Sequence, residues 1–320
     1  DDRSVHCPQP GSAPQPAEGS GGDGSGSGAR AHPGVCRGVR VPEEAVSFLL
    51  LDNGMEPIKH VVLNSGGLIV YAYAGFFNSN QHLLKEVETV TGASAGAIWA
   101  MLYAFGYDPR EIMEILLTIK INELSKASAV SFIKTFGVYS QELIRSTLLS
   151  MVDDRDLTFA ELDITLFVAA YCLNTNKTEY FSKDATPSVK VVDAVLASMS
   201  IPGLFSPVRI GKKYYLDGAF VDKWPADPVI GFNPKHVLRV EPADKNWSRE
   251  QGWGEIKTFK DYFKMLFWSL NAHRHNYQMN THRVSITLGD GLDAFDFASG
   301  YEALLKMVAS GASTGYFLGD

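Results

Sequence analysis

Short apolar runs, separated by longer amphipathic stretches, dominate the chain from about residue 59 onward. The short runs predict β-strands, because several are rich in β-branched or aromatic residues and are bounded by Gly, Asn or Asp. They cover residues 59–63, 164–173, 178–182, 213–216, 236–240 and 282–288, and a further short strand ends at Gly92. An Asn-Thr-Asn turn at residues 174–176 joins two of these strands.

The longer stretches predict helices, because their apolar positions recur at helical spacing and start signals precede several of them. Pro109 follows Asp108 at a first helical position, and Ser140 is a suitable N-cap. The predicted helices cover residues 68–77, 97–102, 140–151, 189–198, 259–271 and 301–318, and another begins at 109. Strands that alternate with helices predict an α/β fold, here three α/β/α layers around a mainly parallel central sheet.

The first forty residues have a different composition. They are rich in Gly, Ser, Pro and Ala, with runs such as Gly24-Ser25-Gly26-Ser27-Gly28. Such a segment buries too little apolar surface to offset its ordering entropy. We therefore expect a disordered tail at residues 1–40, order from about residues 41–51, and a single catalytic domain over residues 41–320.

Composition excludes several classes of protein. Of the 320 residues, 45% are hydrophobic, which is enough for a substantial core, and the net charge of −7 argues against a nucleic-acid surface. The three cysteines (Cys7, Cys36 and Cys172) have no metal-ligand spacing and favour a reducing compartment. We expect no transmembrane helix and no signal peptide, and hence a cytoplasmic protein.

The strongest chemical signal is Gly92-Ala93-Ser94-Ala95-Gly96, which follows the apolar strand and precedes an apolar helix. A serine on a tight strand-to-helix turn projects its hydroxyl away from the backbone, and small neighbours let a substrate carbonyl approach. The helix N-terminus behind it favours developing negative charge. Ser94 is therefore the candidate nucleophile.

Two other motifs provide candidate partners for this serine. Gly66-Gly67 follows the first buried strand and could turn backbone N–H groups toward an oxyanion, while Asp217-Gly218-Ala219 places a carboxylate at a strand end. Each motif is also a common turn sequence, so neither identifies a site alone. Their order around Ser94 is what favours the chemical interpretation.

These residues resemble the patatin-like phospholipase family, which has four sequence blocks in a fixed order. The blocks correspond here to Ser65-Gly66-Gly67-Leu68, Gly92-Ala93-Ser94-Ala95-Gly96, Ala197-Ser198-Met199-Ser200-Ile201-Pro202 and Asp217-Gly218-Ala219, and Pro225 extends the likeness. The resemblance implies a patatin-like fold, Ser94 as nucleophile, Asp217 as general base in a dyad without histidine, and oxyanion-hole amides at Gly66 and Gly67.

The resemblance also implies a lipid acyl hydrolase of phospholipase A or lysophospholipase type, working through an acyl-enzyme without metal or cofactor. Its partner is a lipid acyl ester, which allows peripheral contact with a membrane or lipid droplet. Two alternatives stay open: an acyltransferase of the same fold, and an inactive binding or regulatory relative.

The glycine loop departs from the family pattern. Ile69 stands where the family usually carries Lys or Arg, Ser65 and Val70 replace glycines, and Lys223 stands where Asn is frequent. A missing cation weakens the expectation of a phosphate-bearing substrate. Leu68, Ile69 and Val70 are candidates to line an acyl groove, although core packing explains them equally well.

Histidines offer two rival hypotheses. The order Ser94, Asp217, His236 fits the triad of α/β-hydrolases, but His236 opens an apolar strand, where a structural role is favoured. His273, His275 and His282 are close in sequence, but without a nearby acidic or thiol residue to complete a metal site.

Overall fold

The fold is taken from a computed structural model, which describes residues 56–121, 136–137, 139–220, 224–243, 262 and 280–316. All of these residues belong to one compact unit of the chain, Ser47–Asp320. The expected tail at residues 1–40 and the expected start of order at residues 41–51 lie outside the described residues. The boundary at residue 40 therefore stays a prediction.

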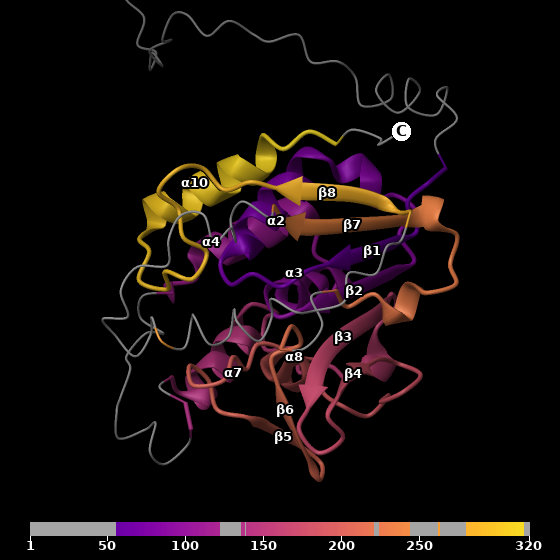
Figure 1. Ribbon diagram of the computed structural model, residues 1–320, viewed down its shortest axis with the longest axis vertical. Coiled ribbons are helices and arrows are strands. Elements are labelled where there is room, and N and C mark those ends of the chain that lie inside the picture. The colour runs from indigo at the N-terminus through magenta and orange to yellow at the C-terminus, as the bar shows by residue number, and fades with distance from the viewer. Residues whose placement is uncertain are drawn as a thin grey trace, which may run out of the picture. The chain divides into compact units, whose positions relative to one another are not determined.

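The described strands form one mixed sheet of eight strands (Figure 1). They are β1 (His60–Leu63), β2 (Thr89–Ala93), β3 (Thr165–Cys172), β4 (Lys177–Phe181), β5 (Val208–Ile210), β6 (Lys213–Leu216), β7 (Val237–Pro242) and β8 (His282–Ile286). The path of hydrogen-bonded neighbours is β5-β6-β3-β2-β1-β7-β8, and β4 pairs with β3 on the side opposite β2 and β6. The run β3-β2-β1-β7-β8 is parallel, whereas β4, β5 and β6 pair antiparallel. The predicted mainly parallel sheet is confirmed.

The longer helices pack against one another in a connected layer. They are α2 (Ile69–Ser79), α3 (Ala95–Ala104), α4 (Pro109–Thr118), α7 (Gln141–Ser150), α8 (Val191–Ser198) and α10 (Tyr301–Ala312). Helix α3 packs on β1, β2 and β3 and also contacts α2, α4 and α8, while α10 lies along α2. Short 3₁₀ helices connect the rest: η1 (Gln81–Leu84), η2 (Phe159–Glu161), η3 (Asp227–Val229) and η4 (Pro234–His236). No helix among the described residues is both long and apolar enough to span a bilayer.

The two faces of the sheet are buried by different parts of the chain. Alternate residues such as Val61 and Leu238 belong to the large core shared with the helices. Their neighbours Val62 and Val237 instead pack with Trp224 in a second, smaller cluster. Burial on both faces explains why these strands read as continuous apolar runs.

Most predicted elements are confirmed, and the local start signals have the geometry expected of them. The Asp108 carboxylate accepts hydrogen bonds from the N–H groups of Arg110 and Glu111 in a capping box, and Ser140 Oγ accepts one from Leu143 N–H. Strand β5 was not predicted, the helix predicted to reach residue 318 ends at Ala312, and the helix predicted at 259–271 lies outside the described residues except for Tyr262.

The contact between α2 and α10 depends on glycine. A Cβ atom added at Gly75 would lie 2.0 Å from the carbonyl oxygen of Val308, and one at Gly311 would lie 1.8 Å from that of Ala72. These helices therefore touch backbone to backbone, at a separation that no larger side chain permits.

Gly75→Ala should force α10 away from α2 and lower the free energy of unfolding by about 1–3 kcal/mol, as overpacking does elsewhere. Gly289→Ala is the matched control, because its added Cβ would meet only ordinary contacts at 3.7 Å or more. Urea unfolding of both variants measures the difference. Equal stabilities would show that the helices can separate without cost.

Candidate active site

Ser94 occupies the turn between β2 and α3 in a backbone conformation that residues with a side chain rarely adopt. Its φ is 52° and its ψ is −117°, and it is the N-cap of α3. Such conformations cost free energy and persist where the surrounding structure enforces them, often at functional sites. The expected strand-turn-helix context of the motif is thus present around Ser94.

The glycines of the motif are required by the close packing of the turn. A Cβ atom at Gly92 would lie 2.5 Å from the carbonyl oxygen of Gly96, and one at Gly96 would lie 2.4 Å from that of Leu63. The first glycine therefore lets α3 start directly above β2, and the second lets α3 lie against β1. The motif is a packing requirement as well as a chemical one.

Strands β2 and β6 lie on the same side of β3. Val168 of β3 pairs with both β2 and β4, so these two strands flank β3 on opposite sides. Tyr171 pairs with both β4 and β6, so these two also lie on opposite sides. Strands β2 and β6 consequently meet end to end along one edge of β3.

This junction brings Ser94 and Asp217 together. β2 ends opposite Ala169 and β6 ends opposite Tyr171. Continuing each register by one residue places both Ser94 and Asp217 level with Ala170. Asp217 is 1% exposed, and its Oδ1 accepts a hydrogen bond of 2.8 Å from Ala219 N–H, which orients the carboxylate.

Ser198, at the end of α8, connects the two turns. Its buried Oγ accepts a hydrogen bond of 2.8 Å from Ser94 N–H and donates one of 2.6 Å to the carbonyl oxygen of Ala169. Its own carbonyl oxygen accepts a hydrogen bond of 2.9 Å from Gly218 N–H. One residue of the Ala-Ser-x-x-x-Pro block therefore holds the serine turn, β3 and the aspartate turn in fixed relation.

Gly66 and Gly67 form a tight loop after β1. Gly67 has a φ of 59°, and a Cβ atom there would lie 2.4 Å from the carbonyl oxygen of Ala294, which also accepts a hydrogen bond of 2.7 Å from Leu68 N–H. Among the described residues, neither Gly66 N–H nor Gly67 N–H donates to a protein acceptor. Of the two glycines, Gly67 lines the cavity described below.

Ala95 N–H is a further donor that sequence reasoning did not name. Ala95 is the first residue of α3, so its N–H has no acceptor within the helix. The amide after a nucleophile on such a turn commonly points to the oxyanion. The motif itself contained this signal, because the residue after Ser94 begins the predicted helix.

An apolar cavity opens beside these groups and encloses about 840 Å³ of empty space, counted to its open mouth. Ser94, Ala95 and Gly67 form part of its wall, and side chains from several helices and loops complete it. The remaining lining residues of the described chain are Leu68, Val70, Tyr71, Ile98, Leu116, Ile119, Ile121, Tyr139, Ile144, Thr147, Leu148, Met151, Met199, Ile201, Phe205 and Phe297. Nearly all of them are hydrophobic, which suits an acyl chain.

Two of the three residues expected to line an acyl groove line this cavity. Leu68 and Val70 line the cavity, but Ile69 does not. Ile69 is fully buried, and its Cγ2 would lie 2.8 Å from a Cβ atom placed at Gly66. Its side chain therefore supports the glycine loop from within the core. Lys223 lies outside the described residues.

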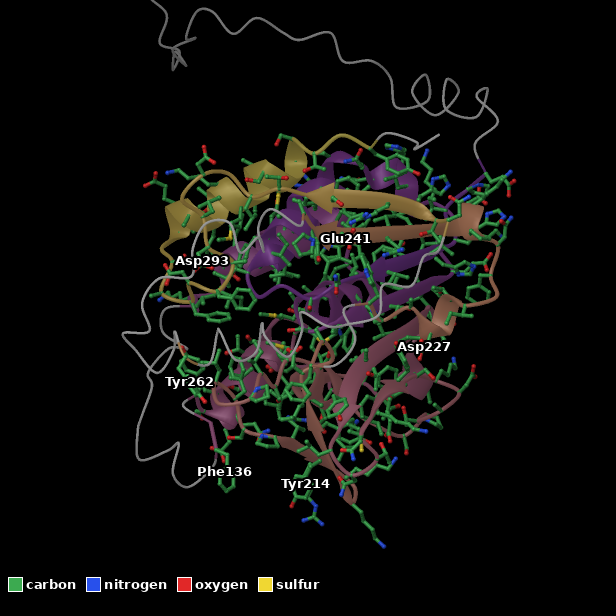
Figure 2. The ribbon with its side chains drawn as sticks, in the orientation of Figure 1. Phe136, Tyr214, Asp227, Glu241, Tyr262 and Asp293 are labelled. Carbon is green, nitrogen blue, oxygen red and sulfur yellow. The ribbon has the colours of Figure 1, made fainter. Side chains whose placement is uncertain are left out.

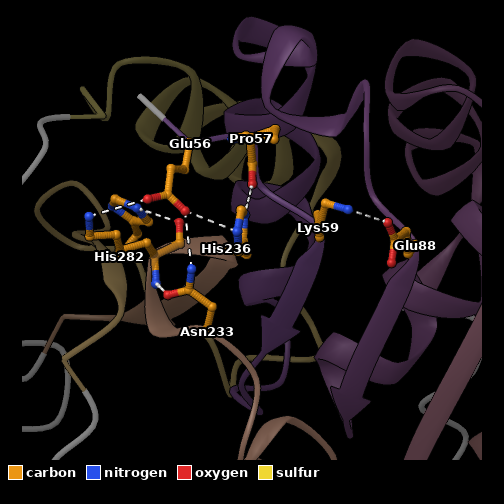
Figure 3. A network of polar contacts seen from close by, with 8 residues as sticks. Glu56, Pro57, Lys59, Glu88, Asn233, His236 and His282 are labelled. Atoms are coloured by element: carbon orange, nitrogen blue, oxygen red, sulfur yellow. Dashed lines mark hydrogen bonds and ion pairs between the residues drawn. The ribbon is translucent and has the colours of Figure 1, made fainter. Parts of the chain in front are cut away.

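The histidines of the described chain lie away from Ser94. In Figure 3, His236 Nδ1 lies 2.7 Å from the carbonyl oxygen of Pro57 and Nε2 lies 3.0 Å from Glu56, while His282 Nε2 lies 2.9 Å from the carbonyl oxygen of Lys235. Both residues stand where β7 and β8 begin, at the amino ends of the parallel strands.

The other two described histidines lie at the same amino edge. His60 begins β1 and stacks on Phe232, and burial lowers its pKa; His82 lies in η1, before β2, and burial also lowers its pKa. Ser94 follows the carboxyl end of β2, about 15–20 Å away at 3.3 Å per residue. The triad rival based on His236 is therefore wrong.

No group of three His, Cys, Asp or Glu residues within the described chain could hold a metal ion. His282 is bonded to backbone at the amino edge, and its sequence neighbours His273 and His275 lie outside the described residues.

The chain is similar to several known proteins. The sequence model of the patatin-like phospholipase family matches residues 61–230. An uncharacterized protein of Acanthamoeba polyphaga mimivirus is 29% identical over 70% of this chain and 80% of its own length. A probable lipid hydrolase of Invertebrate iridescent virus 6 is 26% identical over 55% of this chain and 65% of its own length, so the chain spans less than two thirds of that relative.

Among solved structures, VipD from Legionella pneumophila has the same fold, with a TM-score of 0.55 and 18% identity. The match covers 81% of this chain and 66% of VipD.

Ser198→Ala should leave the buried Ser94 N–H without its acceptor and lower the free energy of unfolding by about 1–3 kcal/mol. Ser200→Ala is the matched control: this hydroxyl is equally buried but donates only to the carbonyl oxygen of Leu196 within the same segment, so a loss under about 1 kcal/mol is expected. Denaturant unfolding compares them. A Ser198→Ala protein no less stable than the control would contradict the connecting role of this hydroxyl.

Proposed function

Because this chain belongs to the patatin-like phospholipase family, we propose that it hydrolyses acyl esters of lipids, with Ser94 as nucleophile and Asp217 as general base. The observation that carries the proposal is the junction of β2 and β6, which places both residues level with Ala170. The strained φ of Ser94 and the apolar cavity beside it support the same assignment.

In the proposed first step, Asp217 accepts the proton of Ser94 Oγ as this oxygen attacks the ester carbonyl carbon. The carbonyl oxygen becomes an oxyanion, which the N–H groups of Gly66, Gly67 and Ala95 stabilise. The C–O bond to the alcohol then breaks, and the alcohol leaves with the proton held by Asp217. The acyl group remains on Ser94.

In the second step, Asp217 accepts a proton from water, which attacks the acyl carbon. The same N–H groups stabilise the second oxyanion. Collapse of this intermediate releases the fatty acid and returns the proton from Asp217 to Ser94 Oγ. This cycle needs one carboxylate and no histidine.

The lining of the cavity supports a long acyl chain as the recognised part of the substrate. Its polar lining side chains are Ser94, Thr147 and two tyrosines, and the rest of the lining is hydrophobic or glycine. Ile69 supplies no cation beside the glycine loop. We infer that the acyl chain, more than a phosphate group, determines binding within the described site.

Ser94→Ala and Asp217→Asn should each reduce fatty acid release from a mixed lipid panel by at least about 10³-fold, because each removes a group that acts in the chemical step. Ser146→Ala and Asp163→Asn, both exposed positions, are the matched controls. Full activity of either site variant, with the fold intact by circular dichroism, would refute the dyad.

A fluorophosphonate probe separates an enzyme from an inactive relative, since it modifies only an activated serine. Labelling at Ser94 in the wild type but not in Asp217→Asn is the expected result. Product analysis with an added alcohol then distinguishes hydrolysis from acyl transfer, because transfer forms a new ester.

Thr147→Trp should shorten the acyl chains that the protein accepts. Thr147 lines the cavity from α7 and is only partly buried, so a larger side chain can enter without disrupting the core. We expect kcat/KM to fall about tenfold or more for long-chain esters, with little change for short-chain esters. Ser146→Trp, the exposed neighbour outside the cavity, is the control, and an equal loss for all chain lengths would contradict an acyl-binding role.

A further inference from the structure

Two hairpin ends lie side by side beyond the carboxyl edge of the sheet. The β3–β4 connection begins at Leu173, three residues past the level of Ser94, so it stands about 10 Å farther out. The β5–β6 hairpin extends equally far from the sheet. Cys172 pairs with Tyr215, so Tyr214 lies opposite Leu173 when this register is continued by one residue. Leu173 N–H donates a hydrogen bond of 2.9 Å to the Tyr214 carbonyl oxygen, and Tyr214 N–H donates one of 2.7 Å to Asn174 Oδ1. We call residues 173–177 and 209–214 the hairpin-end surface.

This surface is basic, although the whole chain carries a net charge of −7. It contains Lys177, Arg209, Lys212 and Lys213 and no acidic residue. The nearest carboxylate, that of Glu179, accepts hydrogen bonds of 2.8 and 3.0 Å from Lys213 Nζ. Among the described residues, no carboxylate forms an ion pair with Lys177, Arg209 or Lys212.

Apolar side chains stand among these cations. Leu173 is 42% exposed and Tyr214 is 44% exposed. Figure 2 shows Tyr214 projecting outward at the end of the β5–β6 hairpin, and Phe136, which is 68% exposed, projects at the same end of the view. The bond from Leu173 N–H to the Tyr214 carbonyl oxygen links the two hairpin ends, and the Arg209 guanidinium lies over the Tyr214 ring, 6.0 Å from its centroid.

We propose that the hairpin-end surface docks on an anionic lipid membrane. Amphipathic groups such as Tyr suit the headgroup region, and basic residues near an anionic leaflet gain electrostatic attraction. A solvated face would need the lysines but not the exposed Leu173 and Tyr214. An acidic protein partner would need a broader apolar interface than these turns provide.

Docking in this way would bring the carboxyl edge of the sheet toward the bilayer. Ser94, Asp217 and the hairpin-end surface all lie at the carboxyl edge, and the amino edge with its histidine network faces away. The interaction is separate from the chemical step, because none of residues 173–177 and 209–214 lines the acyl cavity in the described chain.

The test is sedimentation with vesicles of phosphatidylcholine alone and of phosphatidylcholine mixed with phosphatidylglycerol. All proteins carry Ser94→Ala, so that lipid hydrolysis does not alter the vesicles and a failure of the proposed function cannot imitate a failure of docking. The test variant is Lys177→Glu with Lys212→Glu. The matched control is Lys85→Glu with Lys235→Glu, which changes the net charge equally at the amino edge.

The parent protein should bind the anionic vesicles more tightly than the neutral ones. The test variant should lose at least about 25-fold in affinity, about fivefold for each basic residue removed, and the control should bind as the parent does. Leu173→Ser with Tyr214→Ser should weaken binding while leaving its salt dependence unchanged. Lys177→Gln with Lys212→Gln removes the two positive charges without reversing them, should lose about 25-fold, and covers the case in which charge reversal impairs folding.

Equal binding by the test variant and the control would overturn the proposal, as would absence of binding to anionic vesicles. Lys177→Glu with Lys212→Glu is also made in the protein that keeps Ser94. Its hydrolysis of a short-chain soluble ester should match that of the wild type. Loss of that activity would mean that the hairpin ends support the site itself and would also overturn a docking role.

Discussion

The site depends on a junction that the sheet alone does not hold. The registers of β2 and β6 on β3 bring the two following turns to the same level, but β2 and β6 do not pair with each other, so no ladder bond joins the turns directly. The Ser198 hydroxyl and carbonyl close this junction from α8, through bonds to Ser94 N–H, Ala169 O and Gly218 N–H. Because all of these groups are buried, they cannot form hydrogen bonds with water. Each hydrogen bond within the protein therefore offsets the free-energy cost of removing its donor and acceptor from water. The strained turn at Ser94 can persist because its amide is held in this way.

Local signals in the sequence predicted most of the fold because they act over a few residues. The capping box at Asp108, the hydroxyl cap at Ser140 and the turn between β3 and β4 all formed as expected. Strand β5 has only three residues and no pattern long enough to detect. The site was predicted as a set of separate motifs. Only the family resemblance implied that they meet, because their meeting depends on β6 pairing antiparallel with β3 in line with β2, a contact between segments far apart in the sequence. Tertiary context of this kind overrides local pattern.

The distance in sequence between contacting segments also explains why most residues that line the cavity were not predicted. Residues on the α4, α7 and α8 segments converge on the cavity, and each of them reads in sequence as an ordinary core position. Ile69 was expected in the groove from its place beside Leu68 and Val70, yet the first turn of α2 directs it toward Gly66. On a helix, adjacent residues point in directions about 100° apart, so Ile69 can point into the core while Leu68 and Val70 line the cavity. A site that consists of apolar side chains and backbone N–H donors has no distinctive sequence pattern by which it could be recognised.

The glycine loop has one neighbour whose position in the chain has consequences for biosynthesis. Leu68 N–H is held by the carbonyl oxygen of Ala294, a residue 226 positions later and beyond the stretch that matches the family. When both glycines and the serine turn have been synthesised, the ribosome must still translate the segment that contains Ala294. Only then can Leu68 N–H form its hydrogen bond to Ala294. Contacts of such long sequence separation form late in folding. The nascent chain would therefore carry a formed serine turn for some time beside an incompletely supported glycine loop, which would delay any esterase chemistry until synthesis is well advanced.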